Sequence, residues 1–202
     1  MNPDTLKAAT PESLFIEQLR ARTSAAHKSL EQLPVSSSIL DPSVTKEQYA
    51  HYLQLMYDVV KSLETTIYPL IERIIPNLSD REKSRNIEND LHVLGYQTPD
   101  ANTTVFSTEN LSVPFALGIA YVVEGSTLGG RFILKNIESV LGFDENSGAT
   151  YFAGYGNKTG SRWKNFLESV TGYAVSGDSS GEIIEGAEFA FNRIGKHLQT
   201  RP

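Results

Sequence analysis

Residues 121–133 read Y-V-V-E-G-S-T-L-G-G-R-F-I, an apolar helical pattern that holds three glycines within six positions. Each glycine inside a helix costs about 1 kcal/mol relative to alanine. Gly125 and Gly129 are four residues apart and therefore share one face of the helix. Their missing side chains allow another body, either a second helix or a flat ligand, to approach the backbone closely. The stretch predicts a long helix built around a close contact.

Helical periodicity extends over the rest of the chain and comes with helix start signals. Thr10 and Pro11 are typical of a helix start. The segments Thr45–Gln48 and Ser79–Glu82 both fit the capping-box pattern and predict two further starts. Pro69 predicts a bend in the helix that begins after Thr45, because proline cannot donate the helical hydrogen bond.

The second half of the chain continues this pattern. Gly95 predicts a helix end, and the polar residues 96–112 are typical of a loop. A helix is expected over about 114–141, another around Trp163, and a last one capped by Ser179 with Glu182. Six or seven helices follow from this reading, so we expect an all-α fold, a multi-helix bundle with one core.

Length and composition favour a single domain. The chain has 202 residues, of which 40% are hydrophobic, and this is enough to enclose a cofactor-sized cavity. No internal repeat or low-complexity linker divides it. We expect a flexible N-terminus over residues 1–10 and one helical domain over residues 11–199.

Composition also excludes several kinds of chemistry and partner. The absence of cysteine removes disulfides, thiolate metal sites and cysteine nucleophiles. Residues 1–10 lack the apolar core of a signal peptide, and no apolar run approaches the ~20 residues of a membrane span. The net charge of −6 disfavours nucleic acid as a general partner. A soluble cytoplasmic protein without membrane attachment is expected.

A histidine lies on the apolar stripe of the first predicted helix. The stripe recurs every three or four residues and comprises Ile16, Leu19, Thr23, His27 and Leu30. His27 is therefore expected to point toward the core. Glu31 follows one turn later and can accept the Nδ1 proton, which leaves Nε2 free to bind a metal. On this evidence the imidazole is either a hydrogen-bonded core residue or an axial ligand.

Two motifs together resemble the bacterial heme oxygenases. They are the pattern T-x-x-x-H-x-x-L-E from Thr23 to Glu31 and the glycine-bearing stretch 121–133. The branch associated with bacteriophytochromes is the most similar, and it also resembles residues 151–156, 162–166 and 186–192. The resemblance runs from about Leu14 to Leu198. It implies a heme slot between the first helix and the glycine-bearing helix.

The resemblance assigns roles to residues of the first helix. In the family the proximal histidine ligates the heme iron, which implies that His27 is the metal ligand here. Glu31 would hydrogen-bond the imidazole, and Arg20 would pair with a heme propionate through its guanidinium. Thr23 would lie beside the heme edge.

The glycine-bearing helix would be the distal helix of that family. The backbone at Gly125, Gly129 and Gly130 would cross above the porphyrin, and Tyr121 would contact the heme edge. Mammalian-type members carry an aspartate directly after the first distal glycine, where this chain has Ser126. Ser126, helix carbonyls and ordered water are the candidates to supply the distal hydrogen bonds instead.

The implied reaction is the O₂-dependent opening of heme to biliverdin, with release of CO and ferrous iron. Heme would be both cofactor and substrate. The chain has no nucleotide-binding glycine loop after a strand, so electrons would come from an external reductase, ferredoxin, flavodoxin or chemical reductant. A phytochrome is a conceivable acceptor of the bilin.

Two other enzyme classes of helical bundles lack their required residues here. Thiamine-degrading enzymes of a related fold need a cysteine nucleophile, which is absent, and di-iron oxygenases need Glu-x-x-His pairs, which are also absent. A non-catalytic heme carrier and a degenerate helical bundle that binds a partner protein stay open. His51, His92 and His197 are expected to be surface or structural residues.

Overall fold

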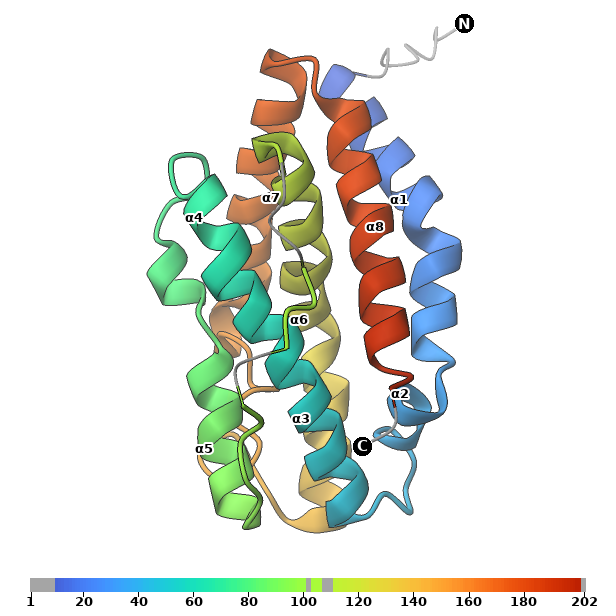
Figure 1. Ribbon diagram of the computed structural model, residues 1–202, viewed down its shortest axis with the longest axis vertical. Coiled ribbons are helices and arrows are strands. Elements are labelled where there is room, and N and C mark those ends of the chain that lie inside the picture. Colours follow the sequence, from blue (N-terminus) through green and yellow to red (C-terminus); the bar gives the residue numbers. More distant parts are fainter. Residues whose placement is uncertain (1–9, 101–102, 107–110, 201–202) are drawn as a thin grey trace, which may run out of the picture.

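The computed structural model describes residues 10–100, 103–106 and 111–200. Helices dominate this part of the chain (Figure 1), and within it β structure is limited to isolated bridges at Asp144. The fold class is all-α, as the sequence predicts. The elements are α1 (Pro11–Glu31), α2 (Pro34–Ser38), α3 (Lys46–Ser62), the π-helical turn η1 (Leu63–Ile67), α4 (Tyr68–Ile71), the 3₁₀ turn η2 (Leu78–Arg81), α5 (Ser84–Leu94), α6 (Val113–Leu141), the 3₁₀ turn η3 (Gly156–Lys158), α7 (Thr159–Ser176) and α8 (Ser180–His197).

The glycine-bearing helix α6 runs through the middle of the bundle (Figure 1). It packs mainly against α8 and α7, while α1 packs against α8 and α7, and α3 packs against α5. Helices α1, α6 and α8 run in the same direction, as the colour gradient in Figure 1 shows. One hydrophobic core connects these helices, and each fully buried Leu or Phe in it stabilises the fold by about 1.5–3 kcal/mol.

The close contact between α6 and α8 uses glycines that the sequence analysis did not single out for packing. A Cβ atom on Gly118 would lie 2.0 Å from the carbonyl oxygen of Ile183. A Cβ atom on Gly186 would lie 2.1 Å from the carbonyl oxygen of Phe115. Neither position can hold a side chain at this distance, so the two glycines set the separation of the two helices.

Three helix ends follow the sequence prediction. The Thr10 side chain accepts a hydrogen bond from the Ser13 amide at the start of α1. Thr45 and Gln48 form the expected reciprocal capping box on α3. Gly95 ends α5 with a φ of 80°, the left-handed conformation that glycine adopts without strain.

Two predicted capping boxes are wrong. Ser79 lies inside the 3₁₀ turn η2, and α5 begins only at Ser84. There the Glu64 carboxylate accepts hydrogen bonds from the amides of Lys83 and Ser84, at 2.6 and 2.8 Å. A carboxylate from a distant helical segment thus replaces a local cap, which no local pattern encodes.

At the start of α8 the cap also differs from the prediction. The Ser179 hydroxyl donates to the Gly177 carbonyl and makes no side-chain cap. Glu182 instead accepts a hydrogen bond from the Ser112 hydroxyl, which ties α8 to the beginning of α6.

The bend expected at Pro69 takes the form of the π-helical turn η1, which ends two residues before the proline. Proline has no amide hydrogen to donate, and its ring crowds the carbonyl of the preceding turn. The wider π turn accommodates both effects. Pro69 then sits in the first turn of α4, where its missing donor is harmless.

Within the predicted loop 96–112, the structure anchors the segment at Val105 and Phe106. Val105 and Phe106 are buried. The Phe106 amide donates to the Ser62 hydroxyl at 2.9 Å, and Arg193 Nε donates to the Val105 carbonyl at 3.0 Å. The flexible N-terminus expected over residues 1–10 lies outside the described residues except for Thr10.

Helix α6 is the one described helix that is long and apolar enough to cross a membrane by length and composition. Half of its most apolar window is buried inside the bundle. This burial is the pattern of a central core helix, so its composition does not by itself indicate a membrane protein.

Candidate functional site

His27 lies on the surface of α1 and does not point into the core as the periodicity predicts. Its side chain is 58% exposed, and its ring meets the edge of Phe191 on α8, with ring centroids 5.8 Å apart. The buried line of α1 consists of Phe15, Leu19 and Thr23. Beyond Thr23 the contact between α1 and α8 passes to Leu30, whose methyl group lies 3.7 Å from a Cβ placed on Gly195. The His27 imidazole, between them, touches α8 at Phe191 and otherwise stays exposed.

Glu31 lies beside the imidazole one turn later, but not in the predicted orientation. The atom nearest its carboxylate is Nε2, at 3.7 Å from Oε1, whereas the prediction placed Nδ1 there. This separation is longer than a hydrogen bond. Both side chains are more than half exposed, so Glu31 does not fix the orientation of the ring.

Tyr121 shows which face of α6 is directed toward α1. Arg20 of α1 lies beside the Tyr121 hydroxyl; burial raises the pKa of this tyrosine, and the guanidinium opposes part of the rise. The two helices run in the same direction and advance by about 1.5 Å per residue. His27 follows Arg20 by as many residues as Leu128 follows Tyr121. His27 is therefore level with Leu128 and Gly129.

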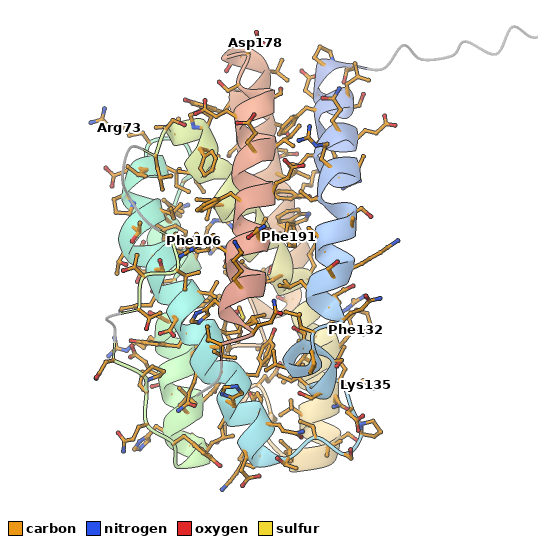
Figure 2. The ribbon with its side chains drawn as sticks, turned by 45° about the vertical axis from the view of Figure 1, so that its right-hand side comes forward. Arg73, Phe106, Phe132, Lys135, Asp178 and Phe191 are labelled. Carbon is orange, nitrogen blue, oxygen red and sulfur yellow. The ribbon has the colours of Figure 1, made fainter. Side chains whose placement is uncertain are left out.

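At that level the face of α6 is open and apolar. A Cβ atom placed on Gly129 would meet no atom within 4 Å. Leu128 and Phe132 are 40% and 60% exposed, and they lie on the same stripe as Tyr121. Figure 2 shows Phe132 close to the lower end of α1. An exposed histidine level with an exposed apolar helix face fits a flat apolar ligand that carries a metal.

Comparison with known proteins gives this site its context. The model of the heme oxygenase family matches residues 13–200. The chain is 30% identical to the heme oxygenase PigA of Pseudomonas aeruginosa over 198 residues, which cover 97% of this chain and 98% of the relative. The chain belongs to the heme oxygenase family.

Solved heme oxygenase structures share its fold. The NO- and CO-bound heme oxygenase of Neisseria meningitidis superimposes with a TM-score of 0.76 and 26% identity, covering 92% of this chain and 90% of the other. The heme oxygenase of Leptospira interrogans gives a TM-score of 0.72 at 17% identity, with 91% and 98% covered. The predicted family, fold and enzyme class are thus confirmed.

The three glycines expected above the heme, Gly125, Gly129 and Gly130, have different surroundings. Gly129 borders open space, whereas a Cβ on Gly125 would touch the Trp163 indole of α7 at 3.4 Å. A Cβ on Gly130 would lie 2.8 Å from the carbonyl oxygen of Phe152. The structure thus explains Gly130 by its contact with the loop before α7.

Two hydroxyl residues of the expected heme site make hydrogen bonds within their own helices. Thr23 is buried, and its hydroxyl donates to the Leu19 carbonyl at 2.7 Å. Ser126 is exposed, and its hydroxyl donates to the Val123 carbonyl at 2.7 Å. Of the two, Ser126 can be reached from the open face without unpacking the helix.

The sequence analysis missed a buried ionic cluster beside α6. Glu124 and Arg81 are both nearly fully buried and form an ion pair. The Tyr155 hydroxyl donates to the Glu124 carboxylate at 2.9 Å. Burial raises the pKa of Glu124, and the neighbouring Arg81 opposes that rise. A glutamate in the middle of an apolar helical run is the one sequence signal that points to this cluster.

The remaining histidines differ in their surroundings. Nε2 of His197 lies 3.3 Å from the Asp58 carboxylate and 3.2 Å from the Leu55 carbonyl, so this residue ties the end of α8 to α3. His92 is exposed on α5, and His51 is half-buried on α3.

Proposed function

We propose that this chain opens heme to biliverdin with O₂, releasing CO and ferrous iron, and that His27 binds the iron. The observation that carries this proposal is the exposed imidazole of α1 at the level of the open, apolar face of α6. A flat macrocycle between these helices would cover Leu128 and Phe132 and bring its metal to the imidazole. Covering their exposed surface would favour binding by the hydrophobic effect.

On the α1 side, Glu31 would orient the proximal imidazole. A half-turn of the exposed ring brings Nδ1 to the carboxylate and frees Nε2 for the iron. The carboxylate would then accept the Nδ1 proton and make Nε2 a stronger donor. Arg20, beside Tyr121, would pair with a propionate near the heme edge. Thr23, although buried, would support that edge from within α1.

On the α6 side, the chain would present backbone and small groups rather than an acid. Bound heme supplies the iron at which O₂ reacts and is itself the molecule that is oxidised. Gly129 and Gly125 would leave room above the heme. Gly130 would keep α6 close to the loop before α7. The exposed hydroxyl of Ser126 would supply a hydrogen bond there, since Glu124 is held in its ion pair with Arg81.

The reaction needs partners that this chain does not contain. Electrons would come from an external reductase, ferredoxin, flavodoxin or chemical reductant. The bilin would pass to a phytochrome, in line with the branch that the sequence resembles most. We place the protein in the cytoplasm, with residues 11–199 acting as one domain.

Addition of hemin, followed by a reductant under air, tests the proposed function. A Soret band should appear with one equivalent of hemin, then bleach after the reductant, with verdin absorption and release of CO. A Soret band that survives reduction in air would indicate a heme carrier and contradict the proposed reaction. The absence of a Soret band would contradict heme binding itself.

A further inference from the structure

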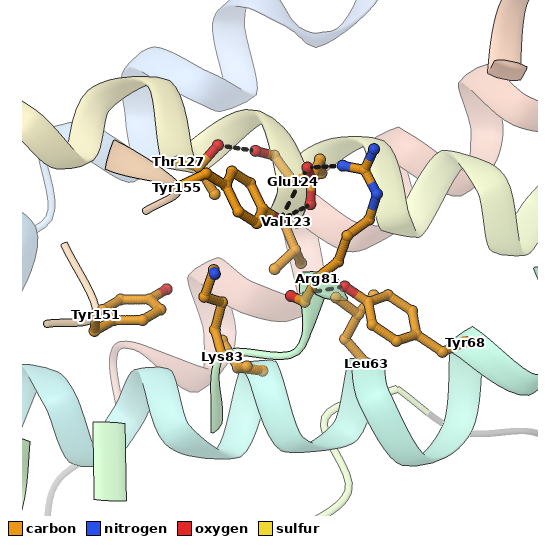
Figure 3. Close-up of a pocket in the computed structure, with 10 residues that line it drawn as sticks. Leu63, Tyr68, Arg81, Lys83, Val123, Glu124, Thr127, Tyr151 and Tyr155 are labelled. Carbon is orange, nitrogen blue, oxygen red and sulfur yellow. Dashed lines mark hydrogen bonds and ion pairs between the residues drawn. The ribbon is translucent and has the colours of Figure 1, made fainter. Parts of the chain in front are cut away.

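Two helices supply the side chains next to the His27 imidazole. Glu31 is its neighbour on α1, and Phe191 is its neighbour on α8. The carboxylate of Glu124 on α6 is engaged elsewhere, because it is buried in its ion pair with Arg81 (Figure 3). Glu31 and Phe191 are therefore the candidates to orient the imidazole.

The ring of Phe191 stands almost perpendicular to the imidazole of His27. The two ring planes make an angle of 84°, and the centroids are 5.8 Å apart, which is an edge-to-face arrangement that aromatic rings favour. Phe191 is only 8% exposed, whereas the side chain of His27 is 58% exposed. The core thus holds the phenylalanine ring, and the imidazole is the partner that is free to turn.

Two further contacts between α1 and α8 hold this pair in register. Nε and Nη2 of Arg22 donate to the two carboxylate oxygens of Glu188, at 2.7 and 2.8 Å, and such a two-point pairing fixes geometry. Further along, a methyl group of Leu30 reaches the backbone of α8 at Gly195. The two helices run in the same direction, so the ring pair lies between these two contacts (Figures 1 and 2). Phe191 therefore has a fixed position beside the turn of α1 that carries His27.

The perpendicular contact restricts the plane of the imidazole but not the choice of nitrogen. A half-turn of the imidazole about its bond to Cβ exchanges the positions of the nitrogen and carbon atoms, and it leaves the ring in the same plane. Phe191 meets the same plane in both orientations. Glu31, in contrast, can distinguish the two orientations, because a carboxylate accepts a proton from nitrogen. The two neighbours of His27 can thus control two different properties of one ring.

We propose that Phe191 is a positioning residue that sets the plane of the His27 imidazole, while Glu31 selects which nitrogen faces the iron. The proposal rests on the proposed function, because it takes His27 as the ligand of the heme iron. It concerns only the orientation of this ligand. Phe191 acts through His27 and needs no contact of its own with heme.

Proton NMR of the protein without heme gives the first test. The ring current of Phe191 should shift the ring protons of His27, which are assigned by their loss in His27→Ala. In Phe191→Leu these resonances should move toward the positions of a free histidine. Phe106→Leu is the matched control, because it removes another buried ring, beside Ser62 of α3, and should leave the His27 resonances unchanged.

Hemin and cyanide added to the same proteins give the second test. In a ferric heme with cyanide opposite the histidine, the plane of the axial imidazole sets the order and spread of the heme methyl NMR shifts. Phe191→Leu should change this order, while its hemin affinity falls by less than about tenfold, because the iron ligand is still present. Glu31→Gln should lower the affinity and keep the order. Phe191→Met, which fills similar volume with a flexible chain, gives the same readout should Phe191→Leu not fold.

Three outcomes would decide against Phe191. They are His27 resonances that do not move in Phe191→Leu, a wild-type order of heme methyl shifts in that variant, and an equal change in Phe106→Leu, which would indicate general loosening. Each would leave the proposed function intact if wild type binds and opens heme. A wild type that takes up no hemin would overturn the proposed function, and the NMR test without heme would still show whether Phe191 holds the ring.

Discussion

His27 combines exposure on α1 with a poor ion-pair geometry, and both properties suit a residue that awaits a ligand. A histidine with a settled structural role has fixed partners, as His197 has in Asp58 and the Leu55 carbonyl. His27 has the edge of Phe191 and a carboxylate at 3.7 Å. The side-chain partners distinguish a structural histidine from a candidate ligand. Sequence position does not, because both His27 and His197 lie on amphipathic helices.

Glu31→Gln should weaken heme binding without loss of fold. A neutral amide accepts the Nδ1 proton less well than a carboxylate, so the imidazole becomes a poorer donor. The loss of such an outer partner costs roughly 10–100-fold in metal affinity. Hemin titration followed at the Soret band measures the change, and Glu17→Gln on the same helix is the control. Equal hemin affinity for Glu31→Gln and wild type would show that Glu31 does not support the iron ligand.

Asp90→Asn should destabilise the protein in a pH-dependent way. Asp90 accepts three hydrogen bonds through its two oxygens, and asparagine offers one oxygen in their place, at a cost of about 1–3 kcal/mol. Burial raises the pKa of Asp90, which the hydrogen bonds oppose. The stability due to this raised pKa is full below the ordinary aspartate value and is lost as pH rises through the raised value.

Urea unfolding at several pH values checks this prediction. The stability difference between wild type and Asp90→Asn should be largest in acid and should shrink as pH rises. A difference that grows with pH would mean that the hydrogen bonds outweigh burial and that the pKa of Asp90 is lowered instead.

At the scale of elements, α6 uses its glycines for two separate purposes. Gly118 meets the backbone of α8, and Gly130 meets the backbone of the loop before α7. Gly129 meets nothing within 4 Å. The sequence predicts that glycines in this helix allow a close approach, but spacing alone does not tell which one faces protein and which faces open space.

Gly118→Ala and Gly129→Ala should therefore have opposite effects on stability. Gly118→Ala forces α6 and α8 apart and should cost about 1–3 kcal/mol. Gly129→Ala should stabilise the protein without heme by up to about 1 kcal/mol, since alanine is the better helix former and nothing obstructs it. The same methyl group should weaken hemin binding. Urea unfolding and hemin titration of both variants test this, and a Gly129→Ala variant that binds hemin as tightly as wild type would place the slot elsewhere.

Helix starts show where local sequence suffices and where it fails. Thr45 and Gln48 cap α3 as predicted because both partners of a capping box lie within one turn. Ser79 has the same spacing to Glu82, yet α5 begins later because Glu64 supplies its acceptor from a distant segment. A local sequence pattern cannot show that tertiary packing will bring another hydrogen-bond acceptor, here the Glu64 carboxylate, to the helix start.

At the scale of the whole molecule, the all-α bundle follows from helical periodicity and from the helix start and stop signals along the chain. The positions of the site residues follow less directly. His27 shares the period of Leu19 and Thr23, but its side chain touches α8 only through Phe191 and stays 58% exposed. How two helices pack is a property of the assembled bundle, so the sequence period predicts the helix but not which of its turns stays exposed.

The buried Arg81–Glu124 pair is a second feature of the assembly. The two residues are far apart in sequence, and Glu124, inside an apolar helical run, gives no indication of its partner Arg81. Their burial places an ionic cluster directly behind the open face of α6, where an apolar core would otherwise continue. The bundle thus has an apolar surface on one side of its central helix and a charged interior on the other.

The central claim is that His27 holds heme against the open face of α6, and hemin titration of His27→Ala beside wild type tests it most directly. Wild type should bind one equivalent with a sharp Soret band, and His92→Ala, which alters an exposed histidine on α5, should behave like wild type. His27→Ala should lose affinity by on the order of tenfold or more and shift the band, because the axial nitrogen is gone. An unchanged Soret band and unchanged affinity in His27→Ala would contradict the account.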